Sequence, residues 1–596
     1  MAEKNQLKSY LTSETLLYLL AFALALALRL FRLEAAPLTD FEAKWALQAW
    51  DTIQGSKPIL GPQPAYVIIT SGLFYLYTGL NALARLLPAV AGSLLVFLPW
   101  LFKPYTGSSL QLKRAGVILA FFLALDPGLV ALSRTAGSPM TALSFGLLTL
   151  GCMAARKPKL AGTLGALALL SGPTLLEGLL GLGLAWLAAR LLAQAGWLNP
   201  PENMQQTDPG GSPFAWKKML LFGLGTFLIV GTGLLIVPQG LAAFASTISA
   251  YLTGWVTPTS VPTLRILSAL VFYQPLAIVF GLAGALMAWI NLNKPQPGFY
   301  FGRLLSLWAL MALFAAIIYP GHEVSSAAWA LIPLWGLASL SLAGLFPEDE
   351  ENFSFATALG HAGLIAFFLI LVGHNLLRLE SLSASPILYA AVVGGIFLMG
   401  AIVTVLVVAG WSLKTALWGL SWGITAVLLV MMFSFTWKAA ILYPNGANEL
   451  WTTGPAAGQM NELVDTVTDL SWWNKSQPHE LDVVITSNAP SLRWAFRSFE
   501  NAQYKAAVSS PDTPSVIIVP NAITDGSQQS LTLPASYRGQ DLVLRKTPAW
   551  TSAIPTDLIR WLAFRQAPST SETLILWVRN DLFPGGSNAQ TITNTP

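Results

Sequence analysis

The chain has 596 residues, of which 54% are hydrophobic and only 10% are charged. Ordinary soluble proteins carry roughly 25% charged residues, so this composition excludes a soluble globular protein. The net charge of +4 is small and the sequence has no basic block, which argues against nucleic-acid binding. Cys152 is the single cysteine, which excludes intramolecular disulfides and metal-thiolate clusters.

Apolar segments of about 20 residues predict transmembrane helices. The sequence predicts about thirteen of them, near 15–33, 84–102, 115–132, 139–155, 159–173, 174–195, 217–237, 264–291, 303–319, 325–346, 356–378, 385–410 and 414–440. Residues 65–80 are apolar but short, which favours a helix lying in the membrane interface. The alternative is a fourteenth span. We therefore predict a mainly α, polytopic membrane protein.

Basic residues orient the predicted spans. Lys4 and Lys8 precede the first span, which places the N-terminus in the cytoplasm. With 65–80 outside the membrane, the basic connections fall on the cytoplasmic side, and thirteen spans leave the C-terminus outside. The first apolar run passes directly into Arg29 and Arg32 with no cleavage site, which indicates an uncleaved signal anchor. The prediction is a multi-pass plasma-membrane protein with an extracytoplasmic C-terminal part.

The charge balance changes at residue 441. Residues 1–440 carry 23 Lys+Arg and 16 Asp+Glu, a net of +7, whereas residues 441–596 carry 10 and 13, a net of −3. We therefore predict a membrane domain over 1–440 and a water-facing domain over 441–596. In the second domain, strand patterns over 481–487 and 514–520 flank a helical pattern over 491–499, which predicts a small α/β domain. Its last residues, 585–596, have a composition that predicts disorder.

The predicted outer loop, residues 34–83, contains the richest group of polar residues. Asp40 and Glu42 lie at the start of a short helix in the sequence LTDFEAKWALQAW. One interpretation is that they cap this helix and interact with its dipole. The other is a carboxylate pair at the membrane surface that acts as a base or holds a divalent cation.

Other polar residues are predicted at the same face. His322 and Glu323, at another outer helix junction, are either metal ligands or a solvated cap. Basic residues there extend to lipid headgroups or bind a lipid phosphate. These basic residues are Arg85, Arg134, Lys44 and Lys57. Glu177 is the clearest acid within a span, which marks it as functional or as a bond to a neighbouring helix. A third interpretation is a transporter or flippase. The sequence shows no chain of buried acids, no paired broken helices and no evident inverted repeat, which argues against an ion-coupled transporter.

The order of motifs over residues 29–140 resembles the polytopic GT-C glycosyltransferases. RLFRL ends the first helix, followed by the acidic loop, by Pro64 and Tyr66, by GLNALARLLP over 79–88, and by ALDPGLVALSR over 124–134. The protein-mannosyltransferase and aminoarabinose-transferase type is the most similar, in particular the flippase-activity-associated branch of bacteria and archaea. FYQPLAIVFGLAG, RWLAFRQAP and LWVRNDLF also fit that branch.

This resemblance implies an activity and a site. Such enzymes take a sugar from a polyprenyl-phosphate carrier at the outer membrane face and pass it to a protein, lipid or glycan acceptor. Carried over to this sequence, Glu42 or Asp40 is the base. The residues implied to bind the donor phosphate are Arg85, Arg134, Lys44 and Lys57. The residues implied to hold a divalent cation, Mg²⁺, Mn²⁺ or Zn²⁺, are Asp40, Glu42, His322 and Glu323.

Three positions depart from the family pattern. Phe41 takes the first place of the usual Asp-Glu pair, Ser138 stands where an Asp is common, and Gln274 replaces a Glu of the similar branch. A transferase must deprotonate its acceptor and stabilise charge on the phosphate that leaves. The missing acids therefore favour an alternative function, a non-catalytic lipid-binding or scaffold subunit of a membrane complex.

Overall fold

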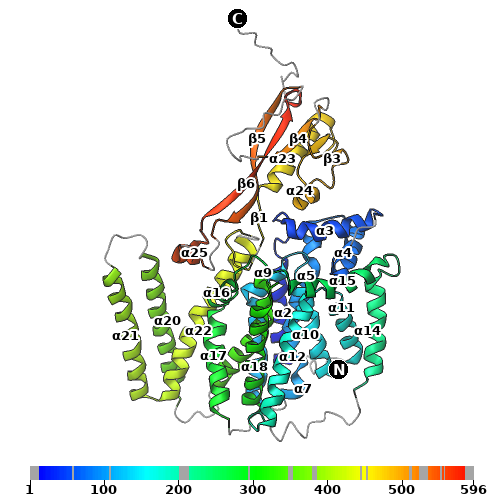
Figure 1. Ribbon diagram of the computed structural model, residues 1–596. Coiled ribbons are helices and arrows are strands. Elements are labelled where there is room, and N and C mark those ends of the chain that lie inside the picture. The colour runs from blue at the N-terminus through cyan, green and yellow to red at the C-terminus, as the bar shows by residue number, and fades with distance from the viewer. Residues whose placement is uncertain are drawn as a thin grey trace, which may run out of the picture.

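The structure, a computed structural model, consists of a body of helices with a sheet domain at one end (Figure 1). It describes residues 12–56, 60–106, 109–200, 214–292, 296–346, 353–378, 386–442, 446–451, 454–508, 513–521, 535–550, 554–555 and 557–583. Lys57 and the segment 585–596, which the sequence analysis singled out, lie outside these residues, as do Lys4 and Lys8. The helical body with its sheet domain confirms the predicted fold class.

The body is a bundle of apolar helices. Its main helices are α2 (Ser13–Leu30), α3 (Asp40–Ile53), α4 (Pro64–Tyr77), α5 (Asn81–Leu94), α8 (Leu110–Leu125), α9 (Pro127–Ser133), α10 (Met140–Ala154), α11 (Pro158–Leu169), α12 (Thr174–Gln194), α14 (Trp216–Gly231), α15 (Gln239–Gly254), α16 (Thr263–Tyr273), α17 (Pro275–Ile290), α18 (Pro297–Ile318), α19 (Ala328–Gly344), α20 (Phe355–Arg378), α21 (Pro386–Gly410) and α22 (Leu413–Trp437). By length and composition, 8 helices in the described part are able to cross a membrane, or up to 10 if each of two bent pairs is one span.

Two segments predicted as single spans are broken helices. α8 and α9 meet at an angle of 54° at Asp126, and α16 and α17 meet at 92° at Gln274. A proline follows each break and cannot donate the backbone hydrogen bond that would continue the helix. The residue before a proline is also disfavoured in the helical conformation. The expectation that the chain has no paired broken helices was therefore wrong.

Three further predicted spans are shorter than a membrane requires. They are α10, α11 and α14, with 15, 12 and 16 residues. The count of thirteen spans is therefore not confirmed. Residues 64–77 do form a helix, α4, and its predicted place in the membrane interface stays a prediction.

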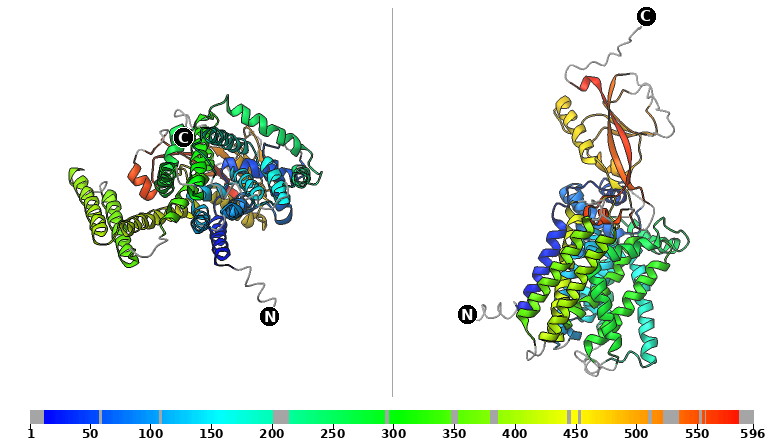
Figure 2. Two further views of the ribbon diagram at one scale, coloured as in Figure 1. Left: turned by 90° about the horizontal axis from the view of Figure 1, so that it is seen from below. Right: turned by 90° about the vertical axis from the view of Figure 1, so that its left-hand side faces the viewer.

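The centre of the body is α19. In the apolar stretch that begins with the short helix η2 (Val324–Ala327) and continues through α19, 83% of the residues are buried. The fully buried Trp335 of α19 packs against Phe122, with 4.5 Å between ring centroids. α21 is the opposite case, because only 6% of its apolar stretch is buried. Together with α20 it stands to one side of the bundle (Figures 1 and 2).

The sheet domain has six described strands in the order β1-β5-β6-β4-β2-β3. They are β1 (Ala456–Ala457), β2 (Val483–Ile485), β3 (Ala502–Tyr504), β4 (Val516–Pro520), β5 (Tyr537–Pro548) and β6 (Ser569–Arg579). β2 runs parallel to β3 and β4, and the other pairs are antiparallel. Two helices, α23 (Met460–Lys475) and α24 (Pro490–Ala495), complete the domain. The predicted strands over 481–487 and 514–520, with a helix between them, are confirmed as β2, β4 and α24.

The sheet domain contacts the body at two places. α24 packs on α3, at the end of the body where α2 ends (Figure 1). The second contact is α25 (Leu558–Phe564), which returns to the body beside α22. There the Nζ of Lys438 donates to the carbonyl of Ala563 (2.6 Å), and the indole of the fully buried Trp561 donates to the carbonyl of Asn448 (2.7 Å). These contacts bring residues from both halves of the chain to one end of the body.

Candidate functional site

Glu42 is fully buried at the start of α3. It forms a capping box with Thr39, whose backbone N–H donates to Oε2 (3.0 Å) while the Thr39 hydroxyl accepts from the Glu42 N–H (3.3 Å). Arg85 donates to both carboxylate oxygens, at 2.7 and 2.8 Å, and the backbone N–H of Ala136 donates to Oε1 (3.1 Å). In the structure, the Glu42 carboxylate therefore caps α3, as one of the two interpretations predicted, and it also forms an ion pair with Arg85.

Arg85 uses its whole guanidinium group in holding the loop that leads to α3. Besides Glu42, it donates to the carbonyls of Leu33 (3.1 Å), Ala36 (2.8 Å) and Pro37 (3.1 Å). A guanidinium has five N–H donors, and these contacts engage all of them. Burial raises the pKa of Glu42, but the charge and hydrogen bonds of Arg85, with the backbone donors, outweigh it, so that this pKa lies below its ordinary value. Glu42 is thus a carboxylate in a stable ion pair.

Asp40, two residues earlier, belongs to a different contact. Its Oδ1 accepts from the backbone N–H (3.0 Å) and the hydroxyl (2.6 Å) of Ser491 in α24, and its Oδ2 pairs with Arg545 of β5 at 2.8 Å. Asp40 therefore joins the body to the sheet domain. Lys44, on the next turn, is exposed, and no residue in the described ranges forms a hydrogen bond or ion pair with it.

The residues predicted to hold a cation do not fit one. Both ring nitrogens of His322 face backbone carbonyls, Nδ1 at 2.6 Å from Tyr319 and Nε2 at 3.0 Å from Val261. Glu323 accepts from the hydroxyl of Ser325 (3.3 Å) and caps the short helix that follows. The described part of the chain contains no group of three His, Cys, Asp or Glu residues that could hold a metal ion. His322 and Glu323 therefore do not form a cation site with each other or with other described residues.

Glu177 bonds a neighbouring helix. Its carboxylate accepts a hydrogen bond of 2.8 Å from the hydroxyl of Ser326 in η2. The same junction is held by the indole of Trp329, which donates to the carbonyl of Thr174 (3.2 Å). Of the two roles predicted for Glu177, a functional one and a bond to a neighbouring helix, the structure shows the bond.

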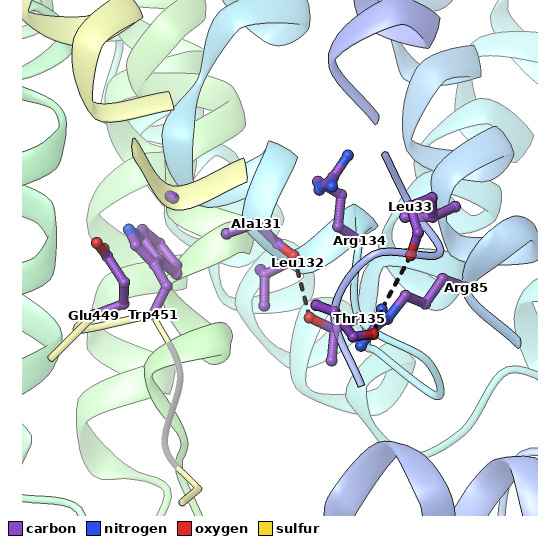
Figure 3. A pocket seen from close by; sticks show the side chains of 10 residues that line it. Leu33, Arg85, Ala131, Leu132, Arg134, Thr135, Glu449 and Trp451 are labelled. Atoms are coloured by element: carbon purple, nitrogen blue, oxygen red, sulfur yellow. Dashed lines mark hydrogen bonds between the residues drawn. The ribbon is translucent and has the colours of Figure 1, made fainter. Parts of the chain in front are cut away.

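A small pocket, with a cavity volume of about 20 Å³, opens where the end of α9, the loop before α3 and the segment after α22 meet (Figure 3). Its described lining consists of Leu33, Ala36, Arg85, Ala131, Leu132, Arg134, Thr135, Ala439, Glu449 and Trp451. The pocket contains two of the arginines predicted to bind a phosphate.

Arg134, one of the two arginines of this pocket, uses only one of its three guanidinium nitrogens in hydrogen bonds to described residues. Its Nη1 donates to the carbonyls of Leu28 (3.1 Å), Arg29 (3.1 Å) and Phe31 (2.9 Å), which fixes the guanidinium against the end of α2. Its Nε and Nη2 donate to none of the residues that the structure describes. Burial, and the nearby charge of Arg85, lower the pKa of Arg134 to about 10, so it is a cation at neutral pH. An anionic group in the pocket would meet a positioned cation.

Glu449 and Trp451 form the wall of the pocket that the sequence analysis missed. Glu449 is 3% exposed and pairs with Arg565 at 3.2 Å, and the hydroxyl of Tyr273 donates to its other oxygen. Trp451 is 4% exposed, and its indole N–H has no acceptor among the described residues. Both residues follow the last helix of the body, in a segment without periodicity, so only the tertiary structure shows where they lie.

A second buried polar cluster lies inside the body at the break between α8 and α9. Arg29 donates to the hydroxyl of Ser133 (3.1 Å) and to the carbonyls of Leu123 and Ala124 (3.0 Å each). Asp126 caps α9 and accepts from the indole of Trp335 (2.8 Å). The sequence contained a signal for this cluster, because an Asp-Pro pair and an Arg within apolar runs are costly unless they are paired.

At the three positions where the resembled family has an acid, the structure shows neutral side chains in packing or hydrogen-bond contacts. Phe41 is 43% exposed and packs edge-on against Trp45. Ser138 is buried and its hydroxyl accepts from the N–H of Met140 (3.0 Å). Gln274 is fully buried at the break before α17, in hydrogen-bond contact with Asp126.

Comparisons with known proteins gave matches among solved structures. No protein-family model matches the chain, and no curated protein matches it. ArnT from Cupriavidus metallidurans, solved bound to undecaprenyl phosphate, is 15% identical with a TM-score of 0.44, over 80% of this chain and 84% of that one. The archaeal oligosaccharyltransferase AglB from Archaeoglobus fulgidus, in complex with an inhibitory peptide and a dolichol-phosphate, is 15% identical with a TM-score of 0.41, over 81% and 63%.

Proposed function

We propose that the protein is a membrane glycosyltransferase that moves a sugar from a polyprenyl-phosphate-linked donor to a protein, lipid or glycan acceptor at the outer membrane face. The observation that carries the proposal is Arg134, a positioned guanidinium that lines a pocket and has two nitrogens without acceptors among the described residues. The unpartnered indole N–H of Trp451 adds a third donor to the same wall. The donor class follows from the resemblance of the sequence motifs.

The chemistry needs such a cation. When the bond between the sugar and the phosphate breaks, negative charge increases on the phosphate oxygens. A guanidinium whose donors are already positioned stabilises that charge without having to reorganise. Since the acidic and histidine side chains do not fit a metal ion, the charge is assigned to Arg134. Arg85 also lines the pocket, but its N–H groups donate to Glu42 and to the loop before α3.

The test is sugar transfer by the purified protein in lipid nanodiscs. Polyprenyl-phosphate sugars serve as donors, and release of polyprenyl phosphate is measured together with binding of undecaprenyl phosphate. We expect Arg134→Ala to weaken binding by about 10- to 150-fold, the loss of one hydrogen-bonded charged contact of about 1.5–3 kcal/mol. Lys44→Ala, which removes an exposed cation outside the pocket, is the matched control. Equal binding by wild type and Arg134→Ala would contradict the site.

The second candidate function is a non-catalytic subunit that binds a polyprenyl phosphate. The favouring observation is that both acids of the first loop are engaged elsewhere, Glu42 with Arg85 and Asp40 with Ser491 and Arg545. This function predicts binding that depends on Arg134, no release of polyprenyl phosphate with any donor, and stable co-purification with other membrane proteins. The transfer assay separates the two functions.

A further inference from the structure

We propose that a groove along α11 and α14 is a binding site for an anionic phospholipid, with one acyl chain in the groove and the phosphate beside Lys159 and Lys217. α14 begins at its end away from the sheet domain (Figure 1), and the start of α11 lies beside it. The groove shares no residue with the described lining of the pocket that contains Arg134. The inference therefore goes beyond the proposed function and does not depend on it.

The groove is apolar and has a cavity volume of about 440 Å³. Residues of α10, α11, α12 and α14 form its walls, together with Trp329 of α19. Leu220 and Leu224 in its lining are 68% and 60% exposed, so the groove opens on the outer surface of the bundle. α12 is long enough to cross a membrane, and an opening beside it faces the hydrocarbon of the bilayer. Such walls favour a hydrocarbon chain, because each CH₂ group that they cover adds to binding.

Glycines give the groove its shape. A Cβ added to Gly162 would lie 2.1 Å from the carbonyl oxygen of Met219, so this glycine allows the backbones of α11 and α14 to touch. A Cβ added to Gly165, one turn later, would meet a side-chain atom of Thr149 at 3.4 Å, which is ordinary contact. Gly165 and Thr149 both line the groove. The missing side chain of Gly165 therefore leaves room in the groove.

Lys159 and Lys217 lie where the groove begins. Lys159 precedes Gly162 by three residues and Lys217 precedes Leu220 by three, so each lysine lies on the helix face that lines the groove. Both lysines are exposed. The Nζ of Lys159 lies 5.3 Å from the ring centroid of Phe222, so this side chain extends from α11 to α14. The two ammonium groups therefore flank the same end of the groove.

No acid in the neighbouring sequence neutralises this charge. Residues 127–176 and 209–322 contain no Asp or Glu. Lys157 and Lys218 add two more exposed cations, and among the residues that the structure describes no acid pairs with any of the four lysines. No side chain caps α11 or α14, so the N–H groups of their first turns add positive potential. The complementary ligand is an anion attached to a hydrocarbon chain, which describes an anionic phospholipid.

The test measures lipid binding to the purified full-length protein by native mass spectrometry. Phosphatidylglycerol and phosphatidylcholine with the same acyl chains are the probes, because they differ in net charge. We expect phosphatidylglycerol to bind at least about 5-fold more tightly, since each lysine near an anionic lipid contributes a factor of about five. The double variant Lys159→Gln, Lys217→Gln should lose about 25-fold in affinity for phosphatidylglycerol by the same reasoning, and its affinity for phosphatidylcholine should not change.

The matched control is the double variant Lys113→Gln, Lys414→Gln. It removes two lysines near the starts of α8 and α22, and neither belongs to the described lining of the groove. It should bind phosphatidylglycerol as the wild type does. Equal affinities of the wild type for the two phospholipids would overturn the proposal. Equal losses in the two double variants would overturn it as well, because they would show only a general effect of net charge.

A second pair of variants tests the place of the acyl chain. Gly165→Leu puts a side chain into the groove, and we expect it to weaken binding of phosphatidylglycerol at least about 10-fold. Gly225→Leu on α14 is the control, because a Cβ there meets nothing within 4 Å and Gly225 is absent from the described lining. Unchanged binding by a folded Gly165→Leu variant would overturn the proposal. If that variant does not fold, the lysine variants decide. Tighter binding of undecaprenyl phosphate than of phosphatidylglycerol, lost in the Lys159→Gln, Lys217→Gln variant, would assign the groove to a different lipid and overturn the proposal.

Discussion

The carboxylate of Glu42 and the guanidinium of Arg85 face each other through two hydrogen bonds of 2.7 and 2.8 Å, and both side chains are at most 2% exposed. The sequence suggested separate roles for them, a base and a phosphate ligand. In the structure they satisfy each other and fix the loop that leads to α3. Removing either side chain should therefore first lower the free energy of unfolding.

Removing one partner of this pair should destabilise the protein strongly. We expect Arg85→Ala to cost about 3–5 kcal/mol, because a buried carboxylate then loses its compensating charge. Lys44→Ala, at an exposed position on α3, should change stability by less than about 0.5 kcal/mol. Unfolding followed by tryptophan fluorescence in one detergent measures both. Similar stabilities for the two variants would contradict the structural role of the pair.

The same pair should make stability depend on pH. The folded-state pKa of Glu42 lies below the ordinary value of 4.5. Its contribution is therefore fully present above about pH 4.5 and is lost as the pH falls through the lower, folded-state value. We expect the Tm of the wild type to fall more steeply below pH 4.5 than that of Glu42→Gln, which cannot titrate. Parallel curves for the two proteins would show that Glu42 is not paired in solution.

Trp494 should hold the sheet domain on the body. It is 2% exposed, its ring lies 5.4 Å from that of Phe74, and its indole donates to Asn81 (2.7 Å). We expect Trp494→Ala to cost about 3–5 kcal/mol and to speed hydrogen exchange in α3. Trp473→Ala is the control, because Trp473 is 69% exposed on α23. Unchanged exchange in α3 of the Trp494 variant would count against this contact.

Chelators should not affect ligand binding. The described residues contain no group of three His, Cys, Asp or Glu residues that could hold a metal ion, and Arg134 supplies the positive charge of the pocket. We expect equal affinity for undecaprenyl phosphate in EDTA and in added Mg²⁺, Mn²⁺ or Zn²⁺. Dialysis against EDTA followed by calorimetry measures this. A tenfold loss of affinity that is restored by one of these ions would show that a cation takes part.

Composition and periodicity predicted the helical body, the α/β character of the second domain and the polar loop around Glu42. They did not predict the breaks at Asp126 and Gln274, because hydropathy averages over a bend that one proline causes. They also missed Glu449, since a single acid in an aperiodic segment carries no signal of its place. Arg134 was predicted from its position beside a helix end. Only the fold shows that Arg134, unlike Arg85, has N–H donors without acceptors among the described residues.

The two-point attachment of the sheet domain has a consequence for the order of assembly. Arg134 lies at the end of α9, whereas Glu449 is reached only after α22 and is held by Arg565 of the sheet domain, which is made later still. During synthesis Arg134 is therefore made long before Glu449 and Arg565. A chain that has not completed its C-terminal domain would present Arg134 without Glu449. The lining of the pocket is thus complete only when the last part of the protein has docked.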